Sequence, residues 1–230
     1  MKKAGRQTPA PDSNCSIIYF SSHGEVNTDE TIRLARKRSE ELGVSKIVVA
    51  SETGLSALKA LRVFRGCEVI VVSSAAGTMV EGSVIGDLRI GVSDDDVFNE
   101  LVGGGAKVVR GTDPLWNIAA HTSVTDLGKL GMMFYRVICD GLHVCVTCVL
   151  EATDTGHLKK GEEVVALAGS FVGLDTAIVA TACNSVNFFS DFEVNEIICK
   201  PRRPRYSWPI NQVDWKGDLE QYRRFIAPRG

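Results

Sequence analysis

Residues 16–73 alternate short apolar runs with helix patterns, and this order limits the fold more than any other feature of the chain. The apolar runs are "SIIYF" (16–20), "SKIVVAS" (45–51) and "CEVIVVS" (67–73). Between them, residues 28–42 and 54–64 carry apolar side chains at helical spacing. Strands joined by helices pair in parallel through right-handed crossovers. We therefore expect a parallel sheet in which residues 16–20 form a buried strand.

The second half of the chain adds antiparallel strands to this sheet. "GEEVVALAG" (161–169) and "TAIVATAC" (176–183) lie too close together for a helix to connect them, which predicts a hairpin. "AKVVRG" (106–111) and "VNEIICKP" (194–201) are two further strands. The expected fold class is therefore α/β, a three-layer α/β/α domain with a mixed, mostly parallel sheet. Residues 94–102 and about 132–153 are expected to be helical, residues 74–87 to form a long loop, and residues 112–131 have no clear assignment.

Composition and charge favour one domain with a tail at each end. The 230 residues, of which 44% are hydrophobic, suffice for one sizeable core. We expect a disordered tail over 1–14, a domain over 15–202 and a basic, aromatic tail over 203–230. Residues 200–230 hold eight Lys or Arg against three Asp or Glu, so the formal charge of −2 leaves an acidic body. An acidic body is a poor footprint for nucleic acid, and no nucleic-acid partner is expected.

The chain has the features expected of a cytoplasmic protein. It contains no apolar run of about 18 residues, so we expect no membrane span or membrane partner. The first residues, "MKKAGRQTPAPDSN", lack the apolar segment of a secretory signal. The seven cysteines are an odd number and lie mostly in apolar stretches, which is typical of free thiols in a reducing compartment. Cys145 and Cys148 form a C-x-x-C pair without a second pair, so no metal site is expected.

One turn combines hydroxyl groups with a helix start. In "VVASETGLSALKAL" (48–61), an apolar strand meets Ser51, Glu52, Thr53 and Gly54, and a helix pattern follows at once. A helix N-terminus presents free N–H groups and a partial positive charge, so it attracts anions. Hydroxyls at 51, 53 and 56 add donors, and Gly54 would let the backbone approach a phosphate. A plain helix cap remains the alternative, and Glu52 would have to point into solvent to avoid repelling the anion.

A second candidate loop follows the strand at 161–169. In "AGSFVGLDTA" (168–177), Gly169 and Gly173 bracket a loop at the carboxyl end of a strand. Ligands bind at this edge of open α/β sheets. An ordinary hairpin turn is the alternative.

With both loops in view, the chain resembles a small, mostly archaeal family of stand-alone proteins built like the C-terminal α/β domain of pyruvate kinase. The resemblance covers about residues 16–202. It is carried by "IYF" (18–20), "NTDETIRLARKRSEELGVSKIVVASETGLSALKAL" (27–61), "KVVRGT" (107–112), "GEEVVALAGSFVGLDTAIVATACNSVNFF" (161–189) and "EVNEIICKPR" (193–202). In pyruvate kinases a turn of the kind T-K-S-G-R-S-A grips a phosphate of a sugar bisphosphate. Here Glu52 and Leu55 replace its Lys and Arg, which weakens the case for a bisphosphate.

The resemblance implies a binder of flavin mononucleotide (FMN), with the phosphate on the turn and the 169–175 loop near the ligand. The kinase barrel is missing from the matched stretches, so the chain is not a pyruvate kinase. The residues expected to bind the cofactor are Ser51, Glu52, Thr53, Gly54, Ser56, Ser73, Ser74, Gly111, Thr112, Gly169, Ser170, Gly173, Asp175 and Thr176.

Three functions stay open at this point. The first is an FMN-binding protein, with a flavin-dependent oxidoreductase of unknown substrate as its enzymatic form. The second is a non-catalytic sensor of a phosphorylated metabolite, and the third is a structural subunit whose tail docks a partner. No catalytic residue stands out, so enzyme status is left open. The aromatic, Arg-rich tail is expected to pack on its own body or on a neighbouring subunit. It favours a homo-oligomer, because an exposed apolar segment is adhesive.

Overall fold

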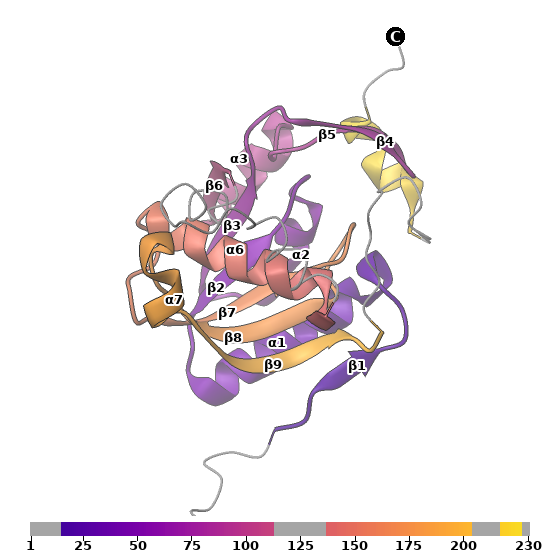
Figure 1. Ribbon diagram of the computed structural model, residues 1–230. Helices are drawn as coiled ribbons and strands as arrows, with labels where there is room; N and C mark the ends of the chain where they lie inside the picture. Colours follow the sequence, from indigo (N-terminus) through magenta and orange to yellow (C-terminus); the bar gives the residue numbers. More distant parts are fainter. Residues whose placement is uncertain (1–14, 113–136, 204–216, 227–230) are drawn as a thin grey trace, which may run out of the picture.

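The computed structural model describes residues 15–112, 137–203 and 217–226, and its centre is a seven-stranded sheet (Figure 1). The strand order is β1-β9-β8-β7-β2-β3-β6. The strands are β1 (Ile18–Phe20), β2 (Lys46–Ala50), β3 (Glu68–Ser74), β6 (Lys107–Gly111), β7 (Glu163–Ala168), β8 (Thr176–Thr181) and β9 (Glu193–Pro201). The sheet is mixed: β8 runs antiparallel to β7 and β9, and all other neighbours are parallel. The expected antiparallel hairpin is confirmed.

Helices cover both faces of the sheet, which confirms the three-layer fold class (Figure 1). The helix α6 (Asp140–Asp154) packs on one face, and α1 (Thr28–Leu42), α2 (Leu55–Val63) and α3 (Asp95–Gly103) pack on the other. The described residues also form short helical turns: η1 (Gly24–Asn27), η3 (Ser185–Asn187), α7 (Phe188–Asp191) and η5 (Leu219–Phe225).

The two cores follow from the two-residue period of the strands. In β2, Ile47 and Val49 belong to the core under α1 and α2, whereas Val48 faces α6. Each of these three side chains is fully buried. Strands that are buried on both faces read as continuous apolar runs, and this explains why "IVVA" shows no alternation.

The first strand differs from the expectation. β1 pairs in parallel only with β9 and forms an edge of the sheet, so it is not a neighbour of β2. Ile18 is 39% exposed and Tyr19 is 51% exposed. The prediction of a buried strand over 16–20 was therefore wrong. An apolar run does not distinguish an edge strand from a central one, because only the pairing partner decides it.

The segment expected to be a long loop over 74–87 is also different. It contains the antiparallel hairpin of β4 (Met79–Ser83) and β5 (Gly86–Arg89), which forms a sheet of its own. The tail segment η5 lies beside this hairpin (Figure 1), and Leu88 forms a β-bridge with Ile226. Tyr222 and Phe225 are both 4% exposed. The hairpin and this part of the tail are therefore held together by buried apolar groups.

The remaining expectations concern small features and undescribed segments. All seven cysteines lie within the described residues and are free thiols, and Cys15 and Cys67 are the least buried. No helix in the described ranges is long and apolar enough to cross a membrane. The assignment of residues 1–14 as disordered, the unassigned part of 113–131, the start of the 132–153 helix and tail residues 204–216 fall outside the described residues.

Candidate functional site

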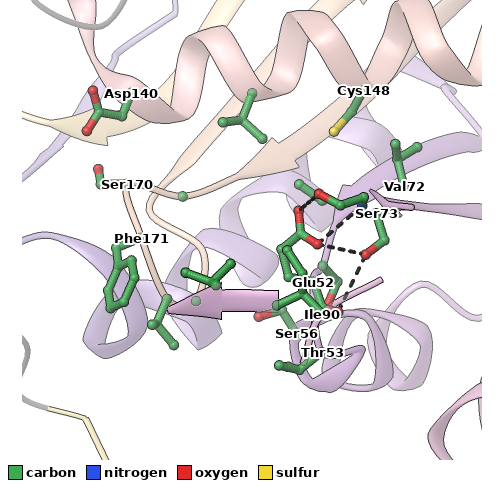
Figure 2. Close-up of a pocket in the computed structure, with 18 of the residues that line it drawn as sticks. Glu52, Thr53, Ser56, Val72, Ser73, Ile90, Asp140, Cys148, Ser170 and Phe171 are labelled. Atoms are coloured by element: carbon green, nitrogen blue, oxygen red, sulfur yellow. Dashed lines mark hydrogen bonds between the residues drawn. The ribbon is translucent and has the colours of Figure 1, made fainter. Parts of the chain in front are cut away.

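A cavity of about 580 Å³ opens where β2, β3, β6 and β7 end. Its lining comes from the turn after β2, the ends of β3 and β6, the loop after β7, the β4–β5 hairpin, α6 and η5. Figure 2 shows α6 running above the turn that holds Glu52, Thr53 and Ser56. The carboxyl edge of parallel strands is where α/β folds bind ligands, and pockets for small molecules have about 300–1,000 Å³.

The turn after β2 brings two hydroxyls to the cavity and uses a third for its own structure. Thr53 and Ser56 line the cavity. Ser51 also lines it, but its Oγ accepts a hydrogen bond from the Ala57 amide at 3.3 Å and is only 7% exposed. Ser51 therefore stabilises the first turn of α2, whose early N–H groups have no partner within the helix. The donors that remain for a ligand are Thr53, Ser56 and the first amides of α2.

Gly54 is required by packing and does not line the cavity. Its φ is +89°, and a Cβ there would lie 2.3 Å from Cγ1 of Val97 on α3. Gly54 is therefore needed for packing against α3 and not for close approach to a ligand in the cavity. The glycine lets the turn pass tightly over α3 and enter α2.

Glu52 is an exposed residue, but its carboxylate does not point away from the site as expected. Its carboxylate accepts hydrogen bonds from Ser73 Oγ at 3.0 Å, from the Ser74 amide at 3.2 Å and from Ser74 Oγ at 2.9 Å (Figure 2). All three residues line the cavity. Donors at the end of β3 are adjacent to the turn after β2, because β2 and β3 are paired neighbours. The carboxylate therefore finds partners inside the site.

The face of α6 that looks into the cavity was missed in the sequence. It carries Asp140, His143, Thr147 and Glu151, each no more than 9% exposed. Their spacing of three, four and four residues is a polar stripe along one face of an otherwise apolar helix. Such a stripe in a buried helix predicts a lined cavity, since buried polar groups need partners. It could have been found from the sequence.

The cysteine pair on α6 has an ordinary structural role. Cys148 lines the cavity, whereas Cys145 is fully buried and donates towards the Ala166 carbonyl at 3.5 Å. Burial raises the pKa of Cys145 well above its usual value. A thiol held protonated is a poor nucleophile. No group of three or more metal-ligating side chains occurs in the part of the chain that the structure describes.

Part of the cavity lining is an apolar wall from the hairpin region and the tail, which were not expected to form the site. Val80, Ile85, Leu88 and Ile90 belong to the hairpin region, and Tyr222 comes from η5. Burial and the nearby Glu25 raise the pKa of Tyr222, so its hydroxyl stays protonated. Residues 80 and 222 are far apart in the sequence, so local sequence patterns could not predict that they line the same cavity.

The loop after β7 lines the cavity through Gly169, Ser170 and Gly173. Asp175 and Thr176 lie behind it and are fully buried. The Asp175 carboxylate accepts hydrogen bonds from the Gly24 amide at 2.7 Å, the Ser170 amide at 3.2 Å and the Thr176 hydroxyl at 2.9 Å. Asp175 therefore positions the loop, and neither residue lines the cavity.

The structure thus brings most of the expected residues to one cavity. Those that line it are Ser51, Glu52, Thr53, Ser56, Ser73, Ser74, Gly111, Gly169, Ser170 and Gly173. Gly54, Thr112, Asp175 and Thr176 lie outside the lining. Among the described lining residues the ionisable groups are Glu52, Asp140, His143, Glu151, Cys148 and Tyr222, and none is Lys or Arg.

A comparison with protein families gives one match that covers this architecture. The model of the family described as "Pyruvate kinase, alpha/beta domain" matches residues 29–180, which is more than half of the chain. The matched range runs from α1 to β8 and includes the turn after β2 and the loop after β7. The hairpin and α6 are also within it, whereas β9 and η5 are not.

Proposed function

The chain belongs to the pyruvate kinase alpha/beta domain family, and from this premise we propose that it binds a phosphorylated small molecule, FMN, in the cavity at the start of α2. Domains of this family often serve as regulatory domains that bind phosphorylated metabolites. The phosphate would lie on Thr53, Ser56 and the first amides of α2. The observation that carries the proposal is that Thr53 and Ser56 line a cavity of about 580 Å³ where α2 begins.

The lining of the cavity offers the two kinds of surface that the two ends of FMN need. Its phosphate needs N–H and hydroxyl donors, and the turn supplies them at the positive end of a helix dipole. Its flat aromatic ring needs apolar surface, which the side chains of Val80, Ile85, Leu88 and Ile90 provide. The hydroxyls between these two ends would meet the polar stripe of α6 at Thr147 and Glu151. A bound flavin supplies electron and hydride transfer.

A non-catalytic sensor of a phosphorylated metabolite is the second candidate. Family membership favours it, since a regulatory domain needs a phosphate site and no catalytic group. The flavin protein and the sensor differ in what the purified protein carries. A yellow protein that releases FMN on denaturation supports the first candidate, and a colourless protein whose melting temperature rises with sugar phosphates supports the second. Absorption spectroscopy and mass spectrometry of the released ligand decide between them.

The phosphate contacts are tested by the double variant Thr53→Ala with Ser56→Ala. Each hydrogen bond to a charged group contributes about 1.5–3 kcal/mol. Losing two should weaken FMN binding by roughly two to four powers of ten. Binding is measured by the quenching of flavin fluorescence, with riboflavin as the ligand that lacks the phosphate. The matched control is Ser190→Ala, which removes an exposed hydroxyl outside the lining.

Two results would contradict this assignment. One is a double variant that binds FMN as tightly as the parent protein. The other is a parent protein that binds riboflavin as tightly as FMN, because the phosphate would then contribute nothing. A correctly folded double variant, checked by circular dichroism, is needed for the first comparison.

A further inference from the structure

The Glu52 carboxylate is an anion that already occupies donors inside the cavity. The Ser74 amide and the hydroxyls of Ser73 and Ser74 donate to it over 2.9–3.2 Å. These three donors are uncharged, so hydrogen bonding alone holds the carboxylate at the end of β3. The turn geometry supports the same arrangement, because the Glu52 carbonyl accepts from the Val92 amide at 2.8 Å and fixes the backbone of the residue.

These donors have the chemistry of a phosphate site. Backbone N–H groups and serine hydroxyls at the carboxyl edge of a parallel sheet are typical partners of phosphate oxygens. The cavity therefore has two neighbouring donor sets, one at the start of α2 and one at the end of β3. The protein itself fills the second set with a carboxylate, and no Lys or Arg stands among the described lining residues to offset that charge.

We propose that Glu52 is a specificity-determining residue that restricts the cavity to ligands with a single phosphate group. This inference rests on the proposed function, since it takes the start of α2 as the site of the first phosphate. A second phosphate would have to displace the carboxylate from Ser73 and Ser74 or lie beside it as a like charge. Either alternative is unfavourable, because like charges repel and no Lys or Arg among the described lining residues offsets them.

The test compares inorganic phosphate with pyrophosphate as probes, each titrated by calorimetry and in competition with FMN. In the parent protein, pyrophosphate should bind no more tightly than phosphate. Glu52→Gln removes the charge and keeps the shape of the side chain. It should improve pyrophosphate binding about tenfold relative to phosphate, which corresponds to about 1.4 kcal/mol. The matched control is Glu81→Gln, which makes the same charge change on β4 at an exposed residue outside the lining.

A second variant tests whether the gain uses the vacated donors. Adding Ser74→Ala to Glu52→Gln should remove most of the pyrophosphate gain, because the second phosphate loses a hydroxyl donor. A pyrophosphate-to-phosphate ratio that Glu52→Gln leaves within twofold of the parent overturns the proposal. So does a gain that Glu81→Gln reproduces, or one that survives the loss of the Ser74 hydroxyl.

Failure of the role proposed for Glu52 can be distinguished from failure of the proposed FMN binding. If FMN does not bind the parent protein, the assignment of FMN fails, and the direct titrations with phosphate and pyrophosphate still decide the role of Glu52. If FMN binds but Glu52→Gln leaves the ratio unchanged, the role of Glu52 fails alone. A loss of FMN binding in Glu52→Gln, with an unchanged melting temperature, would show that Glu52 is a ligand contact and would also overturn the proposal.

Discussion

At the scale of single residues, the turn after β2 separates groups that hold the fold from groups that face the cavity. Gly54 belongs to the first kind because it packs on α3, and Ser51 stabilises the start of α2 although it also lines the cavity. Thr53 and Ser56 belong to the second kind. The residues of this turn therefore have different roles. Substitution of Gly54 should mainly lower the stability of the fold, and substitution of Thr53 or Ser56 should mainly weaken ligand binding.

Gly54→Ala should destabilise the fold. An L-residue at a φ of +89° costs about 1–2 kcal/mol, and overpacking against Val97 adds about 1–3 kcal/mol. Gly43→Ala is the matched control, since its φ is +69° and nothing lies within 4 Å of the added Cβ. Gly43→Ala should lose only the unfolding free energy that the unfavourable backbone conformation costs. Urea unfolding of both variants measures the difference, and equal losses of unfolding free energy would show that Val97 yields without cost.

Sequence patterns predicted the residues of the turn better than their roles. Hydroxyls and glycine next to a helix start identified the edge of the sheet that holds the cavity. They could not show that Glu52 reaches Ser73 and Ser74, because that depends on which strands are neighbours. The polar stripe from Asp140 to Glu151 is visible in the sequence, but it was not recognised because the helix is otherwise apolar. The position of Tyr222 in the cavity could not be predicted, because its contacts are with residues more than a hundred positions away in the sequence.

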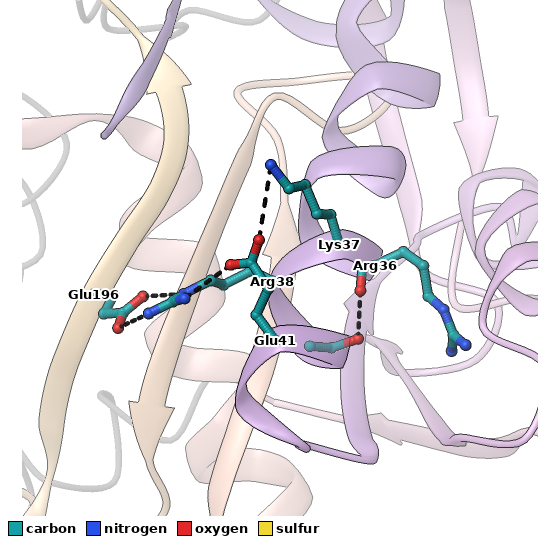
Figure 3. A network of polar contacts seen from close by, with 6 residues as sticks. Arg36, Lys37, Arg38, Glu41 and Glu196 are labelled. Atoms are coloured by element: carbon teal, nitrogen blue, oxygen red, sulfur yellow. Dashed lines mark hydrogen bonds and ion pairs between the residues drawn. The ribbon is translucent and has the colours of Figure 1, made fainter. Parts of the chain in front are cut away.

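At the scale of elements, α1 is fixed to the sheet by ionic contacts as well as by its apolar face (Figure 3). Arg38 donates to both carboxylate oxygens of Glu196 on β9, at 2.7 and 2.6 Å, and to Glu41 at 2.8 Å. These carboxylates raise the pKa of Arg38, and Arg38 lowers the pKa of Glu41. A two-pronged Arg–carboxylate contact adds orientation to the packing.

The start of α3 carries a contact of another kind. Asp94 caps the helix by accepting from the Val97 amide at 3.1 Å, and its other oxygen accepts from Arg224 Nε at 2.9 Å. Arg224 is the first cause that lowers the pKa of Asp94 below its ordinary value of 3.8. A lowered pKa in the folded state gives stability that is complete above about pH 4 and is lost as the pH falls through the lowered value.

Asp94→Asn should therefore separate the two roles. Asparagine caps a helix about as well as aspartate, so only the contact with Arg224 is lost, at a cost below about 1 kcal/mol. Asp94→Ala should lose about 1 kcal/mol more, because it also removes the cap. Urea unfolding at pH 7 and at about pH 2 provides the measurement. The difference between the parent and Asp94→Asn should become smaller at the lower pH, and a difference that does not change with pH would contradict the role of the ion pair.

At the scale of the whole molecule, the tail segment η5 completes the cavity wall that the hairpin begins. Tyr222 lines the cavity, and Phe225 joins the core beside the hairpin residues Ile85 and Leu88. The three-layer domain was predictable because it follows from the order of apolar runs and helix patterns. The apolar wall of the cavity was not predictable, because it combines the hairpin and η5, which are far apart in the sequence.

Deletion of residues 204–230 should open the cavity and expose the hairpin. We expect weaker FMN binding, together with lower solubility or a changed size of the homo-oligomer that the tail composition predicts, because Ile85 and Leu88 lose their cover. Light scattering after size-exclusion chromatography measures the assembly. A chain ending at Ile226 is the control, since it keeps all of η5. A well-behaved monomer before and after the deletion would contradict the homo-oligomer.

The position of β1 at the sheet edge has a consequence for the order of events during synthesis. Ile18 pairs with Cys199, and Phe20 pairs with Pro201. The first strand to leave the ribosome therefore has no sheet partner until the last strand of the sheet has left as well. Parallel pairing of β2 with β3 needs far less chain and can form earlier. A nascent chain should thus form the centre of the sheet first and add β1 only after β9 has been made.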